Sequence, residues 1–315
     1  MRDFEQALAM FANLAPRAGL PAEGWVPALL ARRHDAQAHR IVVALTHPDL
    51  PEVILKAQFM PEDGIDFVQS VSVQAELADR LPGVARVLAR DDAAQVVLMQ
   101  RLPGRTLFDL CANTPVETHA EPLRAAGRWL AQLHGLDGPE DRVFQPKFAL
   151  AQIDRLEAAV SQGQSSVARR PQFMDCLAAM RDNPPVGAEC LTKAGRGHGD
   201  LNPRNLMIDG DTVGALDFRP TRIVPVAHDL ARLFTHYGAF LPELSDCGGP
   251  LPGVDTTPFF EGYDLIGPDD HSLAYLMRMR LLFDWAAIPK HQSRRSPAQQ
   301  IRFRGIRRLI DRAFP

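Results

Sequence analysis

The 315-residue sequence contains no run of about 18 apolar residues, so no membrane-spanning helix is expected. The start of the chain, with Asp3 and Glu5, lacks the basic and then apolar pattern of a signal peptide. Only 4 cysteines occur, and none forms a Cys-x-x-Cys pair, which argues against a zinc module or a disulfide scaffold. We therefore expect a cytoplasmic protein with reduced thiols.

An excess of charge of one sign is also missing, because 35 Lys and Arg residues face 38 Asp and Glu residues. The formal net charge of −3 gives no basic footprint for nucleic acid, so no nucleic-acid partner is expected. Hydrophobic residues make up 46% of the chain and charged residues 23%, which is enough to bury one or two cores. Intrinsic disorder is excluded.

The first hundred residues read as a sheet with two helices. Apolar spacing predicts an opening helix over 3–14 and a second helix over 66–81, and alternating runs predict strands at 25–33, 39–46, 52–59, 85–90 and 95–100, the first three as an antiparallel meander. After Leu102-Pro103-Gly104 the pattern becomes helical, so we divide the chain into lobes at 1–102 and 103–315. Capping-box signals predict helix starts at Thr114 and Ser296.

The segment that carries chemistry is Gly197-His198-Gly199-Asp200-Leu201-Asn202-Pro203-Arg204-Asn205, followed by Leu216-Asp217-Phe218. Phosphoryl transfer from ATP needs an acceptor for the proton of the attacking hydroxyl and oxygen ligands that hold Mg²⁺ against the phosphates. Asp200 can serve as the base, and Asn205 and Asp217 as the metal ligands. The five-residue spacing from Asp to Asn and the Asp-Phe pair match the kinase pattern. A polar turn before a strand is the alternative reading.

These motifs resemble the aminoglycoside phosphotransferase and choline kinase group, small-molecule relatives of protein kinases whose catalytic loop reads His-Gly-Asp. The likeness covers about residues 25–240 and includes Leu133-His134 and Asp229-Leu230-Ala231. The resemblance implies a two-lobed protein-kinase-like α+β fold, with a small antiparallel sheet lobe and a larger, mostly helical lobe. It also implies the cofactors ATP and Mg²⁺ and a small-molecule hydroxyl acceptor.

Further residues are assigned to nucleotide binding. Lys56 ends an apolar strand, where kinases place the lysine that reaches the phosphates, although an exposed edge-strand cation is the alternative. The resemblance pairs Lys56 with a glutamate on the next helix, for which Glu76 is the candidate, and Glu76 could equally be a solvated helix residue. It also places Gln100, Arg101 and Leu102 at an inter-lobe hinge whose backbone meets adenine.

Two positions depart from the kinase pattern. The loop near residues 33–38 contains no glycine, although a glycine-rich turn normally covers the phosphates, so nucleotide clamping there is looser or uses side chains. Arg219 stands where protein kinases carry the glycine after Asp-Phe, which argues for a permanently set metal site.

Two charged residues near the loop have open roles. The resemblance makes Asp229 a brace that hydrogen-bonds the catalytic loop, and a carboxylate favoured at a helix N-terminus is the alternative. Arg204 could meet a γ-phosphate or an anionic substrate, or form a surface ion pair.

The acceptor stays open. Residues 243–270 carry seven acids and no Lys or Arg, which would suit a cationic acceptor, whereas the arginine-rich chain from Arg278 onward would suit a phosphorylated or carboxylated one. Both segments could be solvated faces, and the basic last helix could dock on a membrane or nucleic acid. Residues 203–207 and 216–218 resemble bacterial amino-sugar kinases, so an amino sugar or another sugar or amino alcohol is a candidate. The alternative function is a nucleotide-binding regulatory module or pseudokinase without turnover.

Overall fold

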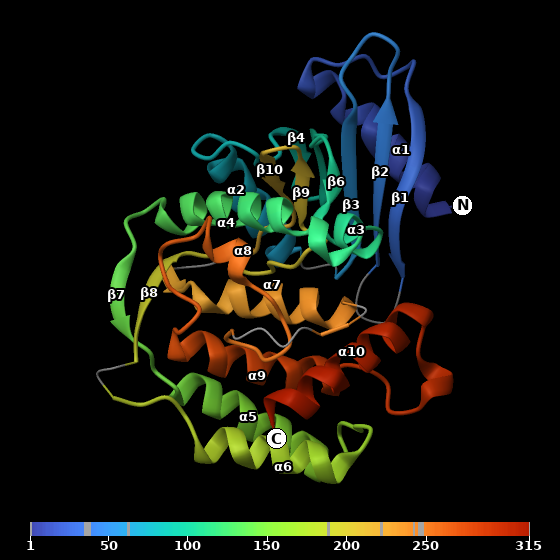
Figure 1. Cartoon of the computed structure of the whole chain (residues 1–315). Helices are drawn as coiled ribbons and strands as arrows, with labels where there is room; N and C mark the ends of the chain where they lie inside the picture. The colour runs from blue at the N-terminus through green and yellow to red at the C-terminus, as the bar shows by residue number, and fades with distance from the viewer. Residues whose placement is uncertain are drawn as a thin grey trace. The chain divides into compact units, whose positions relative to one another are not determined.

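A computed structural model describes residues 2–34, 39–61, 64–187, 190–220, 223–241, 243–244 and 249–314. The chain forms two compact units: Met1–Gly104 with Thr212–Pro220, and Arg105–Asp211 with Thr221–Pro315 (Figure 1). The segment around Asp217 therefore belongs to the first unit by its contacts, and the functional lobes at 1–102 and 103–315 stay a prediction. In the described part of the chain, no helix is both long and apolar enough to cross a membrane.

The first unit contains the predicted five-stranded antiparallel sheet. Its strands are β1 (Val26–His34), β2 (His39–Thr46), β3 (Val53–Met60), β4 (Val87–Asp91) and β5 (Val96–Gln100). They lie in the order β1-β2-β3-β5-β4, and each neighbouring pair is antiparallel. The predicted meander of the first three strands is confirmed.

Helix α1 (Arg2–Leu14), followed by the short η1 (Pro16–Ala18), packs against one face of this sheet. Phe11 of α1 is buried with Leu55 of β3 and Leu98 of β5 in one apolar cluster. Because side chains alternate along a strand, Lys56 points to the face opposite the Leu55 side chain. On α2 (Ile65–Ala78), the buried Gln74 donates to the carbonyl of Ala85 (3.0 Å), which ties this helix to the chain before β4.

A late segment of the chain joins the first unit through β10 (Thr212–Ala215). Ala215 forms a parallel bridge with Val84, and its amide donates to the carbonyl of Gly83 (2.9 Å). At Gly214 a Cβ atom would lie 2.8 Å from that same carbonyl oxygen, so this close approach requires glycine. The bridge fixes the backbone two residues before Asp217.

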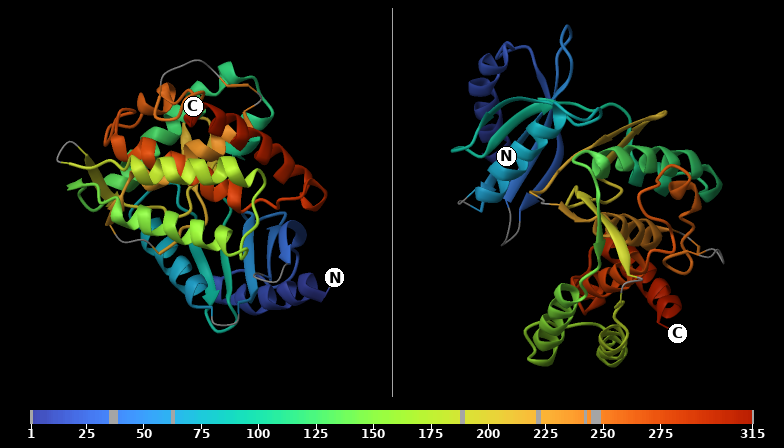
Figure 2. Two further views of the ribbon diagram at one scale, coloured as in Figure 1. Left: turned by 90° about the horizontal axis from the view of Figure 1, so that it is seen from below. Right: turned by 90° about the vertical axis from the view of Figure 1, so that its left-hand side faces the viewer.

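The second unit is mostly helical. Its helices are α3 (Leu107–Ala112), η2 (Val116–Thr118), α4 (Ala120–Gly135), α5 (Lys147–Ser161), α6 (Arg170–Asp182), α7 (Ala227–Phe240), α8 (Thr257–Phe260), α9 (His271–Ala286), η3 (Gln292–Arg294) and α10 (Pro297–Ala313). α7 packs on α9, α10 contacts both, and α5 and α6 pair beneath α9 (Figure 2). Short strands complete the unit: β6 (Arg105–Thr106) pairs with β9 (Leu206–Asp209), and β8 (Leu191–Arg196) lies between β7 (Glu140–Val143) and β11 (Ile223–Pro225).

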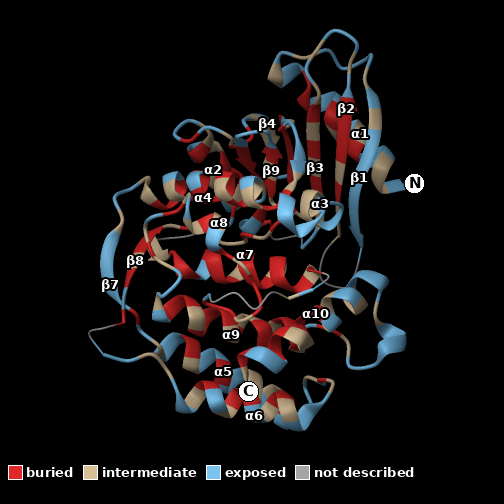
Figure 3. Cartoon of the chain, in the orientation of Figure 1, coloured by how far each residue is buried: buried red, intermediate tan, exposed pale blue. Residues whose placement is uncertain are grey.

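The core of the second unit centres on α7 and α9, which are largely buried along their length (Figure 3). Phe234 and Trp285 are 0% exposed. Gly305 of α10 lies so close to α7 that a Cβ atom would stand 1.7 Å from the carbonyl oxygen of Ala239. α7 and α10 therefore approach each other backbone to backbone.

One predicted helix start is wrong and the other is confirmed. The Thr114 hydroxyl donates back to the carbonyl of Leu110 (2.8 Å) at the end of α3, and α4 begins only at Ala120 after a 3₁₀ turn. A local side-chain bond to the preceding helix thus outcompetes the capping box. At Ser296 both reciprocal bonds with Gln299 are present, and α10 begins there as predicted.

Candidate active site

The predicted catalytic loop, residues 197–205, connects β8 and β9 in the second unit. The buried imidazole of His198 accepts a hydrogen bond at Nδ1 from the amide of Asp200 (3.3 Å). Gly199 between them has φ +82°, a left-handed conformation that favours glycine. This turn explains the His-Gly-Asp order.

Asp229, in the first turn of α7, anchors the loop through hydrogen bonds. Its carboxylate accepts bonds from the amides of His198 (2.5 Å) and Gly199 (3.0 Å), and its Oδ2 lies 3.3 Å from Nε2 of His134. The predicted brace is confirmed. Burial by itself would raise the pKa of Asp229, but the hydrogen bonds and charges from His134 and His198 hold that pKa below its ordinary value.

The loop is also fixed from within by two carboxamides. Asn205 Nδ2 donates to the carbonyl of Asp200 (2.9 Å), and Asn202 Nδ2 donates to the same oxygen (3.0 Å). The structure therefore brings Asp200 and Asn205 together, as their spacing implies. Since the Asn205 bond uses the nitrogen, its side-chain oxygen is the atom suited to a cation.

Arg232, one turn further along α7, contacts the Asp200 side chain. Its Nη2 lies 2.7 Å from Oδ1 of Asp200, and its Nη1 donates to the carbonyl of Gly199 (3.4 Å). The Asp200 side chain is 25% exposed, so solvent and small molecules can reach it. The sequence analysis did not single out Arg232. Its signal is the spacing of Asp229, Arg232 and His236, which puts three polar side chains on one face of a helix.

In the first unit, Lys56 and Asp217 form an ion pair across 161 positions of sequence. Nζ of Lys56 lies 2.5 Å from Oδ1 of Asp217, whose side chain remains 49% exposed. Asp217 has φ +60°, a conformation that aspartate tolerates but seldom adopts. The predicted partner of Lys56 was Glu76, but the half-exposed Glu76 side chain faces solvent and pairs with Arg80, which lies just beyond the end of α2 (3.2 Å).

The predicted hinge residues follow β5. The Gln100 amide donates to the carbonyl of Arg86 (2.9 Å), and Arg101 forms an ion pair with Glu52 (2.5 Å). Leu102 is 8% exposed and packs against Gly214. The backbone here is thus held by strand contacts of the first unit.

Arg204 makes aromatic contacts. Its guanidinium carbon lies 3.4 Å from the ring centre of Phe108 and 5.9 Å from that of Phe240, an arrangement of the cation–π type. Of the alternatives raised for Arg204, the ion pair is wrong for the described residues, in which no carboxylate lies within bonding distance. Burial lowers the pKa of Arg204, the negative charge of Asp109 opposes this shift, and the positive charge of Arg302 adds to it.

Three of the seven acids in the stretch 243–270 are used within the fold. Asp270 caps α9 through the amide of Leu273 (2.9 Å), Asp255 accepts from the amide of Thr257 (2.9 Å), and Glu261 pairs with Arg124. Asp246 lies outside the described residues. So do positions 35–38 of the glycine-free loop, for which phosphate clamping stays a prediction.

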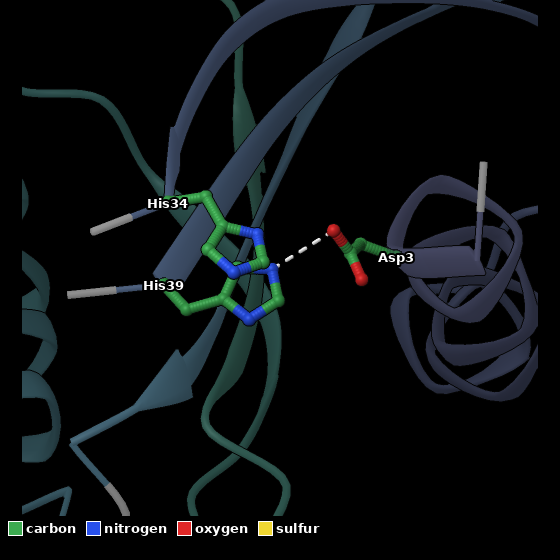
Figure 4. A group of neighbouring side chains, drawn as sticks. All are labelled: Asp3, His34 and His39. Atoms are coloured by element: carbon green, nitrogen blue, oxygen red, sulfur yellow. Dashed lines mark ion pairs between the residues drawn. The ribbon is translucent and has the colours of Figure 1, made fainter. Parts of the chain in front are cut away.

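A group of possible metal ligands lies where β1 ends and β2 begins. Atoms of Asp3, His34 and His39 all lie within 4.8 Å of one another, and the two imidazoles are stacked (Figure 4). The Asp3 carboxylate is paired with His39 (2.9 Å) and with Arg32. The hydrogen bond from His39 leads the causes that lower the pKa of Asp3. Arg32 and His39 therefore already account for this carboxylate.

The model of the phosphotransferase enzyme family matches residues 32–246, which include the catalytic loop and the Lys56–Asp217 pair. The chain belongs to this family. It is thus a small-molecule kinase with a protein-kinase-like α+β fold, as the sequence predicted. A search of curated proteins found no match.

Solved structures of similar fold cover nearly the whole phosphotransferase. A choline/ethanolamine kinase family protein from Mesorhizobium loti is 15% identical with a TM-score of 0.60, over 98% of this chain and 95% of that one. A macrolide 2′-phosphotransferase from Brachybacterium faecium is 16% identical with a TM-score of 0.59, over 95% and 97%. An amicoumacin kinase in complex with AMP-PNP and Ca²⁺ is 14% identical with a TM-score of 0.55, over 90% and 88%. At these identities the likeness concerns the fold.

Proposed function

We propose that this phosphotransferase moves the γ-phosphoryl group of ATP to a hydroxyl of a small molecule, with Asp200 as the base. The observation that carries the proposal is the fixed catalytic loop: Asp229 anchors its amides, and Arg232 holds a carboxylate that remains open to solvent. The fold supports ATP as the donor, because the similar amicoumacin kinase was solved with AMP-PNP.

The nucleotide end of the reaction is assigned to the first unit. Lys56 of the first unit would contact the phosphates, and the backbone of Gln100, Arg101 and Leu102 would meet adenine. We propose that the functional lobes are residues 1–102, which bind the nucleotide, and residues 103–315, which carry the proposed base and the acceptor site.

The residues proposed as magnesium ligands fit a hard cation. Asp217 offers a half-exposed carboxylate and Asn205 a carboxamide oxygen, which are the ligand types that Mg²⁺ prefers. Mg²⁺ bound there would neutralise charge on the phosphates.

At the acceptor end, Asp200 takes the proton of the attacking hydroxyl. The hydroxyl oxygen forms a bond to the γ-phosphorus, the bond from that phosphorus to the β–γ bridging oxygen breaks, and ADP leaves. Arg232 keeps the Asp200 carboxylate in one rotamer for this transfer. Sugars, amino sugars and amino alcohols are the candidate acceptors.

Asp200→Asn tests the assignment of the base. We expect phosphotransfer and slow ATP hydrolysis to fall about 100-fold or more, while Mg-dependent ATP binding, measured by calorimetry, stays near the wild-type value. Asp211→Asn, which alters an exposed carboxylate near the end of β9, is the matched control. Equal turnover by Asp200→Asn would refute the base. ATP binding without any turnover in the wild type would favour the regulatory module.

A further inference from the structure

Four arginines gather on the Asp200 side of the second unit: Arg204, Arg232, Arg280 and Arg302, here named the arginine cluster. Arg232 pairs with Asp200 (2.7 Å), and Arg204 stands four positions beyond Asp200 in the same loop. Arg280 comes from α9 and Arg302 from α10. Distant parts of the chain thus bring positive charge to the proposed base.

His236 and Asp284 connect the members of the arginine cluster. His236 lies one helical turn beyond Arg232, and its Nε2 is 2.6 Å from Nη2 of Arg302. Asp284, whose side chain is 3% exposed, lies 2.7 Å from Arg302, 2.9 Å from Arg280 and 3.5 Å from His236. The contacts run without a break from the buried Asp284 to α7.

The charges of this region do not balance. Four guanidinium groups face three named carboxylates, those of Asp109, Asp200 and Asp284, and His236 adds no negative charge. Burial lowers the pKa of His236 to about 3, although the negative charge of Asp284 opposes this shift. The imidazole ring of His236 is therefore neutral at pH 7. Among these side chains the guanidinium groups outnumber the carboxylates by one.

Three side chains of the arginine cluster are partly exposed, although their Nε atoms are buried. Side-chain exposure is 28% for Arg232, 27% for Arg280 and 25% for Arg302, whereas that of Asp284 is 3%. Neutralising one buried carboxylate requires one cation. The further guanidinium groups lie close together beside the proposed base, although they repel one another. Such a group of arginines is typical of a site that binds an anion.

We infer that the acceptor carries a carboxylate or phosphate group, and that the arginine cluster binds this group while the acceptor hydroxyl contacts Asp200. The inference rests on the proposed phosphotransfer and names its substrate class. Arg232 and His236 are separated by one helical turn, about 5.4 Å along the axis. The anionic group is therefore only a few bonds from the reacting hydroxyl, as in a sugar acid, a sugar phosphate or a hydroxy acid.

Matched acceptor pairs test the inference. In each pair one member carries an anionic group that the other lacks: glucose and glucuronic acid, glycerol and glyceric acid, and ethanolamine and serine for carboxylates, with glucosamine and glucosamine 6-phosphate for phosphates. In all but the ethanolamine pair, this group takes the place of one free hydroxyl. Acceptor-dependent ADP release and product mass are measured. We expect at least one anionic member to exceed its partner tenfold or more in kcat/KM, and the pairs distinguish carboxylate from phosphate.

Arg302→Gln removes one binding group without touching the proposed base. We expect kcat/KM for the preferred anionic acceptor to fall tenfold or more while the rate with its uncharged partner stays within twofold. A merely structural role would lower both rates alike. Arg304→Gln, an equal charge change at an exposed position of the same helix, is the control. If Arg302→Gln does not fold, Arg302→Gln/Asp284→Asn removes both charges and serves in its place.

The inference is overturned if no anionic member reacts faster than its partner, or if Arg302→Gln lowers both rates equally. Slow ATP hydrolysis that is lost in Asp200→Asn monitors the proposed function separately. When that hydrolysis is present and no anionic acceptor is preferred, the substrate class is wrong and the phosphotransferase assignment stands. When hydrolysis and acceptor phosphorylation are both missing, both proposals fail.

Discussion

Replacing Asp229 with asparagine tests how the catalytic loop is held. The two oxygens of the Asp229 carboxylate accept hydrogen bonds from two backbone amides. An asparagine side chain has only one oxygen, so its NH₂ group would face the second amide. Losing one buried bond to a charged acceptor and leaving its donor unpaired costs about 3 kcal/mol. For a chain of this length we expect the melting temperature to fall by about 4–5 °C.

The pH dependence of this loss has a defined sign. Because the folded pKa of Asp229 lies below its ordinary value of 3.8, its carboxylate stabilises the fold above that value. The stabilisation is lost as the pH falls through the folded pKa. The difference in melting temperature between the wild type and Asp229→Asn should therefore be present at about pH 5 and shrink below about pH 4.

Activity provides a second measurement of the same variant. A displacement of about 1 Å at the reacting group costs roughly 100-fold in rate, so kcat should fall far more than stability alone explains. Asp211→Asn serves as the control, because its exposed carboxylate makes only a 3.7 Å ion pair with Arg128. Equal melting temperatures and equal kcat values for the two variants would refute the bracing role.

Two further predictions concern packing and thiol chemistry. Gly305→Ala should lower the free energy of unfolding by about 1–3 kcal/mol in denaturant titrations, because its Cβ would meet the Ala239 carbonyl. Gly135→Ala is the control and should be neutral or stabilising, because the space around Gly135 is open. Similar values for both variants would contradict the packing of α10 on α7. Burial raises the pKa of Cys111 to about 12 and, with nearby acids, that of Cys176 to about 11. Mass spectrometry should show iodoacetamide labelling at pH 8 roughly 100-fold or more slower in the folded chain than in urea for both thiols, and equal rates would contradict their burial.

The sheet was predictable because its signals are local. Strand alternation depends on which face each side chain takes, so the five strands were found within a few residues. The helix start at Thr114 failed for the opposite reason. A capping box competes with other bonds of the same hydroxyl, and the contact with Leu110 at the end of α3 wins.

The site was predictable only where its contacts span few residues. Asp200 and Asn205 meet through a hydrogen bond across five positions, which a spacing rule describes. Lys56 and Asp217 are 161 positions apart, so chemistry suggested both residues but not that they pair. Asp284 was missed, although a carboxylate between Leu282 and Trp285 in an apolar helix is a signal that it needs buried cationic partners.

α7 links these observations, because three of its polar residues follow a helical repeat. Asp229, Arg232 and His236 are spaced by three and four positions, so their side chains lie on one face. Asp229 fixes the loop amides, Arg232 holds the proposed base, and His236 reaches the arginine cluster. A single helix, buried against α9 and locked to α10 at Gly305, thereby sets the base and the proposed anion-binding groups in one frame. Changes in α7 packing should consequently alter catalysis and acceptor selection together.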